Sequence, residues 1–480
     1  MDRAGSIVKP MLGSVPRRDA VLFLAVVAVA AAARLYGLGS PDELVFDEVY
    51  YAQDACSYLG WGEPVCGVAT EASHVHPPLG KWLIAMGILL FGHEPTGWRI
   101  MPALAGIATV GFVYLLTRRL TASSLAATVA AGVLALDPLS VVSSRVAMLD
   151  IFTAAAGVAA VTFAVLDRDR VASRGPDARR MRRPWLIAAG LAGGVAIGTK
   201  WSGALVLGAV VLLVLAWEVA ALRRGGRTTA SALVGAAPAV FVWLLALPAL
   251  VYAASFAGRL DGDLLSAPWQ QDAWVRQLGG RQLQMLGFHA GLDETHRAAS
   301  PAWSWLLGKR AVVYFFEVDA AGRYREVLAF ANPLLWLPGA AAAGWAALVA
   351  ARRRALWSAE VLVAAAVASA YLPWLVLTAG RPFVFLHYIV PTIPFLALAL
   401  GWALSRMPRL PGRAFAAAVG ATAIGVVVFW SPLIYAWPLD YDAWRSRIVF
   451  ADCGPEAVAD GRLMPRPTVA TDPPPGWCWV

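Results

Sequence analysis

Two adjacent carboxylates and a nearby proline-bounded histidine run are the residues of this chain best suited to chemistry. Asp47 and Glu48 directly follow the first apolar segment, and the run HPPLGK extends from His76 to Lys81. Carboxylates beside hydrocarbon are costly to keep ionised, so a protein that holds them there generally uses one as a base or ligand. We therefore expect catalysis at a membrane surface, with Asp47 and Glu48 as the candidate catalytic residues.

The composition is that of a polytopic membrane protein. Hydrophobic residues make up 59% of the chain and charged residues only 15%, whereas a soluble domain carries about 25% charge. The net charge of +9 comes mainly from arginines clustered between apolar segments. Such clusters mark the cytoplasmic face, so nucleic-acid binding is not inferred. Arg3, Lys9, Arg17 and Arg18 precede the first apolar segment and predict a retained signal anchor with a cytoplasmic N-terminus.

About eleven apolar windows have the composition and approximate length needed to cross about 30 Å of hydrocarbon. We predict an all-α polytopic protein forming one membrane domain over residues 1–480, with an extracytoplasmic C-terminus and no appended soluble domain. The arginine clusters assign the first outer loop to 39–97, a long outer loop to 255–328 and an outer tail to 435–480. The predicted windows are about 20–38, 98–117, 122–136, 151–166, 185–199, 204–222, 230–254, and four more between 328 and 435.

Shorter amphipathic segments are predicted to lie along the membrane interface. Residues 79–91 are too few for a comfortable span, and the preceding prolines favour a helix start at this point. Within the long outer loop, 269–286 and 303–316 combine aromatic and polar residues in the manner of interfacial helices. We therefore expect the outer loops to contain helices as well as connections.

All four cysteines, Cys56, Cys66, Cys453 and Cys478, fall in the predicted outer segments. An oxidising compartment permits disulfides, and an even number is what pairing requires. Local pairing would join Cys56 to Cys66 and Cys453 to Cys478, although sequence alone does not determine connectivity.

Four cations stand at the predicted outer ends of spans, namely Arg99, Arg145, Lys200 and Arg381. A cation at that depth can reach a lipid phosphate, although any one of them is also explained as a side chain snorkelling to the interface. We expect two or three of the four to contact phosphate.

Asp150 is a second acidic candidate. It lies five residues after Arg145, so a salt bridge between them and a role in substrate binding are both open.

Four further residues are candidates for substrate contact. His76 and Lys81 are predicted to shape the first outer loop or touch substrate. His74 and His76 form a His-X-His pair, but no third ligand is defined, so no metal site is predicted and a divalent-metal requirement stays open. His387 and Tyr388 begin a span at its outer edge and could contact phosphate or sugar, with a structural role for the histidine equally consistent.

Taken in chain order, the motifs resemble those of the protein O-mannosyltransferases. The resemblance implies the GT-C glycosyltransferase fold and a polyprenyl or dolichyl phosphate mannose donor, with Ser and Thr hydroxyls of secreted proteins as acceptors. The large soluble insertion of eukaryotic members is missing from 255–328, as in bacterial members. The matching residues are Phe46–Tyr50, His76–Lys81, Trp98 with Arg99, Arg145 with Leu149 and Asp150, Gly198–Gly203, Asn332 with Pro333, and His387 with Tyr388.

The chemistry of such a donor sets the roles of the two carboxylates. A sugar phosphate carries a good leaving group, so transfer needs a base for the acceptor hydroxyl and positive charge for the phosphate, but no strong acid. The resemblance assigns the base to Asp47, with Glu48 positioning the acceptor or adjusting the base. Neighbouring carboxylates cannot easily flank one sugar ring, so we expect inversion. No nucleotide-binding loop is present, which also favours a lipid-linked donor.

The partners expected from this interpretation are the lipid-linked donor, a secreted protein or peptide acceptor and the surrounding membrane lipid, with secretion machinery as a further candidate. The expected location is the cytoplasmic membrane, with chemistry at its outer face. Alternatives are a transferase that moves aminoarabinose or arabinose to a lipid or glycan, a membrane transporter, and a non-catalytic scaffold. A transporter would show matched halves with broken spans, and no such repeat is evident.

Overall fold

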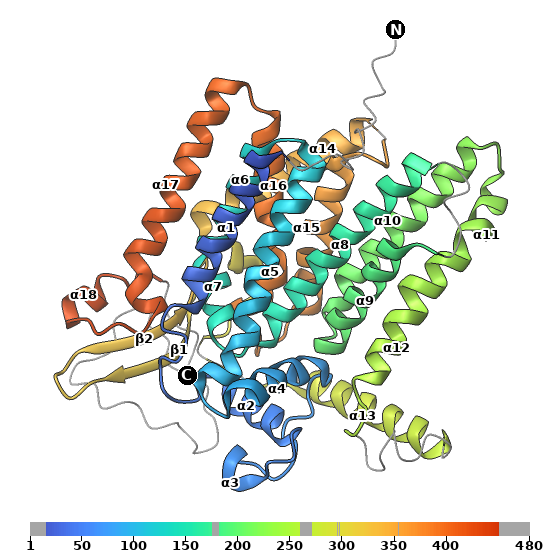
Figure 1. Ribbon diagram of the computed structural model, residues 1–480. Coiled ribbons are helices and arrows are strands. Elements are labelled where there is room, and N and C mark those ends of the chain that lie inside the picture. Colours follow the sequence, from blue (N-terminus) through green and yellow to red (C-terminus); the bar gives the residue numbers. More distant parts are fainter. Residues whose placement is uncertain are drawn as a thin grey trace.

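The computed structural model describes residues 16–174, 182–259, 271–294, 296, 298–353 and 355–450. The predictions for Arg3, Lys9, Cys453 and Cys478 lie outside these residues. Long helices form a bundle, and shorter elements gather at one of its ends (Figure 1). The long helices are α1 (Arg17–Leu35), α5 (Pro95–Thr121), α6 (Ser124–Leu136), α8 (Leu149–Arg174), α9 (Pro184–Thr199), α10 (Gly203–Arg224), α11 (Thr229–Val240) continuing through η2 (Phe241–Ala246) into α12 (Leu247–Ala254), α14 (Pro333–Arg353), α15 (Ala359–Leu377), α16 (Ile393–Arg406) and α17 (Arg409–Ile434).

Each predicted apolar window falls on one of these helices, but the predicted count of eleven spans is not confirmed. Within the described residues, 8 helices are long and apolar enough to cross a membrane, or 9 if the bent pair of α6 and α7 (Pro138–Arg145) counts as one span. The axes of that pair differ by 56°. Helix α9 has only 16 residues, and the 19-residue α1 carries charges at both ends.

Helix α16 forms the centre of the bundle. Its apolar side chains are buried on all sides, which explains why its sequence shows no polar face. Helices α5, α6 and α14 pack around it. The close approach depends on Gly401, because a Cβ there would lie 2.8 Å from the Thr117 side chain and 2.9 Å from the Ala126 carbonyl oxygen. Through α5, this centre is connected to Arg99, which lies near the start of that helix.

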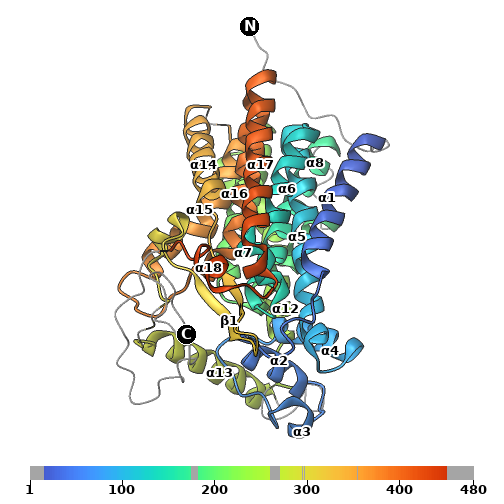
Figure 2. The same cartoon turned by 90° about the vertical axis from the view of Figure 1, so that its left-hand side faces the viewer.

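The segments predicted to lie outside share one end of the bundle in both views (Figure 1 and Figure 2). Two of the arginines predicted to be cytoplasmic form ion pairs with carboxylates: Arg119 with Asp169 at 2.6 Å and Arg406 with Glu360 at 2.6 Å. Which end faces the cytoplasm stays a prediction. The short elements are α2 (Glu48–Ser57), α3 (Glu63–Cys66), α4 (Leu79–Phe91), α13 (Gln271–Gly291), η3 (Ala302–Leu307), β1 (Val312–Val318), β2 (Tyr324–Ala329), η4 (Leu386–Thr392) and α18 (Tyr441–Arg445).

The long outer loop contains one feature that the sequence prediction missed. Helix α13 forms in this loop where a helix was expected, as α4 does in the first outer loop, but the predicted helix over 303–316 is wrong beyond Leu307. Strand β1 follows there and pairs antiparallel with β2. β-Branched and aromatic residues make up most of β1, β2 adds Tyr324 and Val327, and Gly322 takes a φ of 75° in the connecting turn, so local propensity favours a hairpin.

The first predicted disulfide is confirmed. Cys56 at the end of α2 bonds to Cys66 at the end of α3, with their Cα atoms 5.4 Å apart. The bond ties the loop after α2 back onto the helix that begins next to Asp47.

Replacing both cysteines by serine should lower the thermal stability of the purified protein. The cross-link closes a loop of 10 residues, for which chain entropy predicts a loss of about 2–3 kcal/mol. Thermal unfolding in detergent measures the effect, with wild-type protein treated with reductant as the matched control. An unchanged midpoint in both the variant and the reduced protein would contradict the stabilising role.

Candidate active site

Glu48 lies at the centre of a buried ion pair. Its side chain is fully buried, and its two oxygens accept from Arg99, at 2.9 Å from Nε and 2.8 Å from Nη2. The same oxygens accept the backbone N–H groups of Ala147 and Val45, at 2.8 Å and 3.0 Å. A carboxylate has about four acceptor positions, so the protein already uses all of them.

The guanidinium of Arg99 likewise has all its hydrogen-bond donors paired within the protein. Besides its two bonds to Glu48, its guanidinium donates to the carbonyls of Leu38, Pro41 and Glu43, at 3.3, 2.7 and 2.8 Å. These contacts account for all five N–H groups of the guanidinium. The geometry therefore favours a positioning role for Arg99 and Glu48, and it does not support the predicted contacts of Arg99 with phosphate or of Glu48 with the acceptor.

Asp47 stands beside this pair with a different environment. It precedes α2, and the hydroxyl of Tyr51, one helical turn later, donates to its carboxylate. Phe46 has a φ of 49°, a left-handed conformation that is uncommon outside glycine, and its ring stacks on Tyr314 at 4.3 Å. Packing of the Phe46 ring therefore supports this uncommon backbone conformation directly before Asp47.

Burial raises the pKa of Asp47 to about 6, against the opposing effects of Lys200 and of the Tyr51 hydrogen bond. The negative charge of Asp150 acts in the same direction as burial. A carboxyl group with such a pKa is ionised at neutral pH and binds a proton more strongly than an ordinary aspartate, which suits a general base.

Lys200 and Asp150 form an ion pair next to Asp47. The ammonium lies 3.0 and 2.9 Å from the two oxygens of Asp150 and 4.8 Å from the ring centroid of Tyr388. The partner of Asp150 is thus Lys200, and the salt bridge to Arg145 considered from the sequence is not formed. The pair brings α8 and the turn between α9 and α10 together at the site.

Histidines and aromatic rings line the remaining sides. The ring of His76 lies 6.0 Å from Tyr51 and 5.5 Å from His289. Burial, together with the charge of Lys200, holds the pKa of His76 well below its usual range, so its imidazole is neutral at neutral pH. His387 packs against Phe46 and Phe385, and its buried Nδ1 has no hydrogen-bond partner among the described residues. Neutral imidazoles can both donate and accept, as binding of sugar hydroxyls requires.

Comparison with known proteins identifies the family. Residues 96–260 match the model for dolichyl-phosphate-mannose-protein mannosyltransferases, and residues 275–452 match that for the C-terminal four-helix membrane region of protein O-mannosyltransferases. A polyprenol-phosphate-mannose–protein mannosyltransferase of Mycolicibacterium smegmatis strain MKD8 is 30% identical over 460 residues, which cover 85% of this chain and 86% of the relative. The chain belongs to the protein O-mannosyltransferase family. A relative from Corynebacterium glutamicum with the same name is 28% identical and covers 90% of this chain and 93% of its own length.

Solved structures show that this O-mannosyltransferase has the GT-C fold. The Saccharomyces cerevisiae Pmt1-Pmt2 complex bound to its sugar donor superposes with a TM-score of 0.73 at 16% identity, covering 90% of this chain and 92% of that chain. ArnT from Cupriavidus metallidurans bound to undecaprenyl phosphate gives 0.54 at 21% identity, covering 90% and 69%. The predicted fold class is thereby confirmed.

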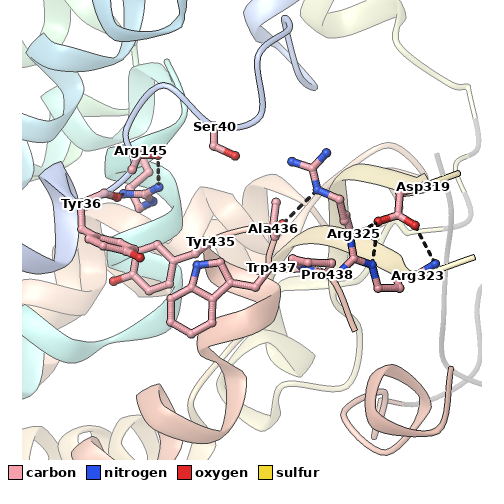
Figure 3. A pocket seen from close by; sticks show the side chains of 11 residues that line it. Tyr36, Ser40, Arg145, Asp319, Arg323, Arg325, Tyr435, Ala436, Trp437 and Pro438 are labelled. Atoms are coloured by element: carbon pink, nitrogen blue, oxygen red, sulfur yellow. Dashed lines mark hydrogen bonds and ion pairs between the residues drawn. The ribbon is translucent and has the colours of Figure 1, made fainter. Parts of the chain in front are cut away.

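Three further predicted site residues, Lys81, Arg381 and Arg145, form no described hydrogen bond or ion pair with Asp47. Lys81 is fully buried and pairs with Asp54 and Glu71, each at 2.8 Å, so of its two predicted roles the geometry supports shaping the loop. Arg381 donates to the carbonyl of His289 at 2.8 Å. Arg145 faces a separate cavity (Figure 3) and has no described hydrogen bond or ion pair with Asp47, Asp150 or Lys200.

Two residues of the site were not predicted from the sequence. Tyr51 lies four residues after Asp47, and that spacing on a helix was a usable signal for contact. His289 belongs to α13 in the long loop and reaches the site only through tertiary packing, for which the sequence carries no local signal. Among the described residues, no three His, Cys, Asp or Glu side chains group as a metal ion would require.

Glu48→Gln should destabilise the O-mannosyltransferase and abolish its activity together. The substitution leaves the buried Arg99 charge without its counter-ion, which typically costs about 3–5 kcal/mol. Glu43→Gln is the matched control, because that side chain is exposed in the same loop. Thermal unfolding measures both variants, and a fully stable Glu48→Gln protein would contradict the positioning role.

Proposed function

We propose that this chain transfers mannose from polyprenyl phosphate mannose to Ser or Thr hydroxyls of proteins, with inversion at the anomeric carbon and Asp47 as the base. The printed names of its relatives support the donor and the protein acceptor. The observation that carries the catalytic assignment is the Asp47 carboxylate, which is incompletely buried, has a raised pKa and neighbours the Lys200–Asp150 pair.

In the proposed step, the acceptor hydroxyl gives its proton to the Asp47 carboxylate while its oxygen attacks C1 of the mannose. The bond between C1 and the phosphate oxygen breaks, and the electron pair leaves with the polyprenyl phosphate. Lys200 is the cation best placed to balance the growing negative charge on that phosphate, because two of its three N–H groups contact Asp150 and one remains. His76, His387 and Tyr388 are assigned to binding the sugar and phosphate.

We further propose that the reaction occurs at the outer face of the cytoplasmic membrane. This assigns 39–97, 255–328 and 435–480 of one GT-C membrane domain, 1–480, to the outer side and the N-terminus to the cytoplasm. The disulfide between Cys56 and Cys66 supports an oxidising compartment for that side. An unfolded secreted protein would then be available as acceptor next to the secretion machinery.

Asp47→Asn should reduce transfer to background while leaving the protein folded. An amide cannot accept the hydroxyl proton, and loss of general base catalysis typically costs about 10²–10⁴-fold. Purified protein in nanodiscs receives radiolabelled polyprenyl phosphate mannose and a Thr-rich peptide, with Asp42→Asn, an exposed acid in the same loop, as control. Equal turnover by Asp47→Asn and wild type would remove Asp47 as the base. A product with the donor's own anomeric configuration would contradict inversion.

The pH profile of kcat/KM should show an acidic limb centred near the Asp47 pKa of about 6. Activity is expected to fall as the pH drops through this value, because only the ionised carboxylate can accept a proton. Lys200 lowers the pKa of Asp47, so Lys200→Met should move the limb to higher pH, and Tyr51→Phe should move it in the same direction. A limb that stays in place in both variants would show that another group titrates.

A further inference from the structure

A cavity lies apart from the cluster of Asp47, Asp150, Lys200 and the neighbouring histidines, between the end of α1, the β1–β2 hairpin and the segment after α17. Its volume is about 440 Å³. Figure 3 shows the cavity surrounded by guanidinium groups, which come from α7 and the hairpin, and by aromatic rings, which come from the segments that follow α1 and α17. The residues that matter are Tyr36, Arg145, Arg323, Arg325, Tyr435 and Trp437.

Arg145 brings an uncompensated charge to this cavity. Its side chain is only 5% exposed, and its guanidinium donates to the carbonyls of Arg34, Tyr36 and Gly37 while lying 4.5 Å from the ring centroid of Tyr435. Within the described chain, no carboxylate forms an ion pair with it. Carbonyls orient a guanidinium but carry no net charge, and a buried cation without a counter-ion costs several kcal/mol. An anion bound in the cavity would supply the counter-ion that Arg145 lacks within the described chain.

The rest of the lining is also cationic. Arg323 pairs with Asp319 at 2.9 Å, and Arg325 pairs with Glu317 at 2.8 Å while donating to the carbonyl of Ala436. Asp319 is the single carboxylate residue in the lining, against three arginines. These two ion pairs are partly exposed to solvent and contribute little free energy, so Arg323 and Arg325 can instead bind an anion that accepts stronger hydrogen bonds, such as a phosphate.

The position of the cavity favours a lipid as the source of the anion. Tyr36 follows α1 and Trp437 follows α17, and these residues are 60% and 40% exposed, as Tyr and Trp are at headgroup depth. Both helices pack on α6 and α7, and apolar side chains such as Leu24 and Val428 are exposed along them. A lipid lying against these helices would bring its headgroup to the cavity.

We propose that this cavity is an anion site for the phosphate headgroup of a membrane phospholipid, separate from the donor site at Asp47. Arg145 supplies the buried charge, Arg323 and Arg325 the outer charges, and Tyr36, Tyr435 and Trp437 the aromatic walls.

The same short segment serves both sites. Arg145 faces the cavity, the N–H of Ala147 holds Glu48, and Asp150 holds Lys200. A phosphate bound to Arg145 stabilises the start of this segment and, through Ala147, the backbone that carries Asp47. Anionic phospholipid should therefore increase transfer activity as well as bind.

Binding is tested by native mass spectrometry of the full chain, titrated with phosphatidylglycerol or phosphatidylcholine. Wild type should retain one phosphatidylglycerol, and the double variant Arg323→Gln/Arg325→Gln should weaken its affinity about tenfold, equal to 1.4 kcal/mol. Arg447→Gln is the control, because that arginine lies near α17 but bonds to the carbonyl of Phe429. Arg145→Gln should weaken binding further, but it also removes the hydrogen bonds of three buried backbone carbonyls. The double variant Arg323→Gln/Arg325→Gln is therefore the decisive one.

Four outcomes would overturn the proposal. They are equal retention of both lipids, unchanged affinity in the double variant, displacement of phosphatidylglycerol by inorganic phosphate at comparable concentration, and displacement by undecaprenyl phosphate or an acidic peptide. Displacement by free phosphate would indicate a soluble anion, and the last outcome would indicate a substrate site.

Activity is tested in nanodiscs of phosphatidylcholine with and without phosphatidylglycerol. Wild type and Arg447→Gln should gain several-fold in kcat from phosphatidylglycerol, and the double variant should not, with its activity in phosphatidylcholine unchanged. An equal gain by the double variant would overturn the coupling. This readout rests on the proposed function, whereas lipid retention does not, so failure of one is distinguishable from failure of the other.

Discussion

The buried ion pair of Glu48 and Arg99 is the constraint on which the site depends. It joins the loop that leads into α2, the start of α5 and the backbone between α7 and α8, three segments far apart in the sequence. Both side chains have all their hydrogen-bonding capacity satisfied inside the protein. In a buried environment such a pair is tolerated only when every donor and acceptor is matched, so it also fixes where Asp47 stands.

The neighbouring carboxylates illustrate how environment separates two chemically equal groups. Glu48 accepts hydrogen bonds from a guanidinium and two backbone amides. Asp47 accepts a hydrogen bond from the hydroxyl of Tyr51, and the positive charge of Lys200 acts on it by electrostatic attraction. Glu48 is fixed in place by these bonds, whereas burial raises the pKa of Asp47 to about 6. Lys200 is shared between Asp150 and this site, so a departing phosphate would compete with Asp150 for it.

The segment from Arg145 to Asp150 connects the Asp47 site with the cavity that Arg145 lines. On one side it supports the Asp47 cluster, and on the other it presents Arg145 to the aromatic and cationic cavity. A membrane enzyme built this way can link the composition of its surrounding lipid to the geometry of its catalytic loop, because both depend on a few consecutive residues.

The sequence by itself determined the membrane class, the helical windows and the Asp47–Glu48 motif, because hydropathy and motif spacing are local properties. It also favoured the disulfide between Cys56 and Cys66, which are only ten residues apart, but the structure decided that pairing. The sequence did not determine the partners of the charges. Arg99 and Arg145 were both candidates for contact with phosphate, yet Arg99 is fully bonded to Glu48 and to backbone carbonyls, and Arg145 lines a cavity apart from Asp47. His289 and the hairpin joined the site region from the long loop. Only tertiary structure decided these contacts, because an ion pair forms between whichever opposite charges packing brings within a few ångströms.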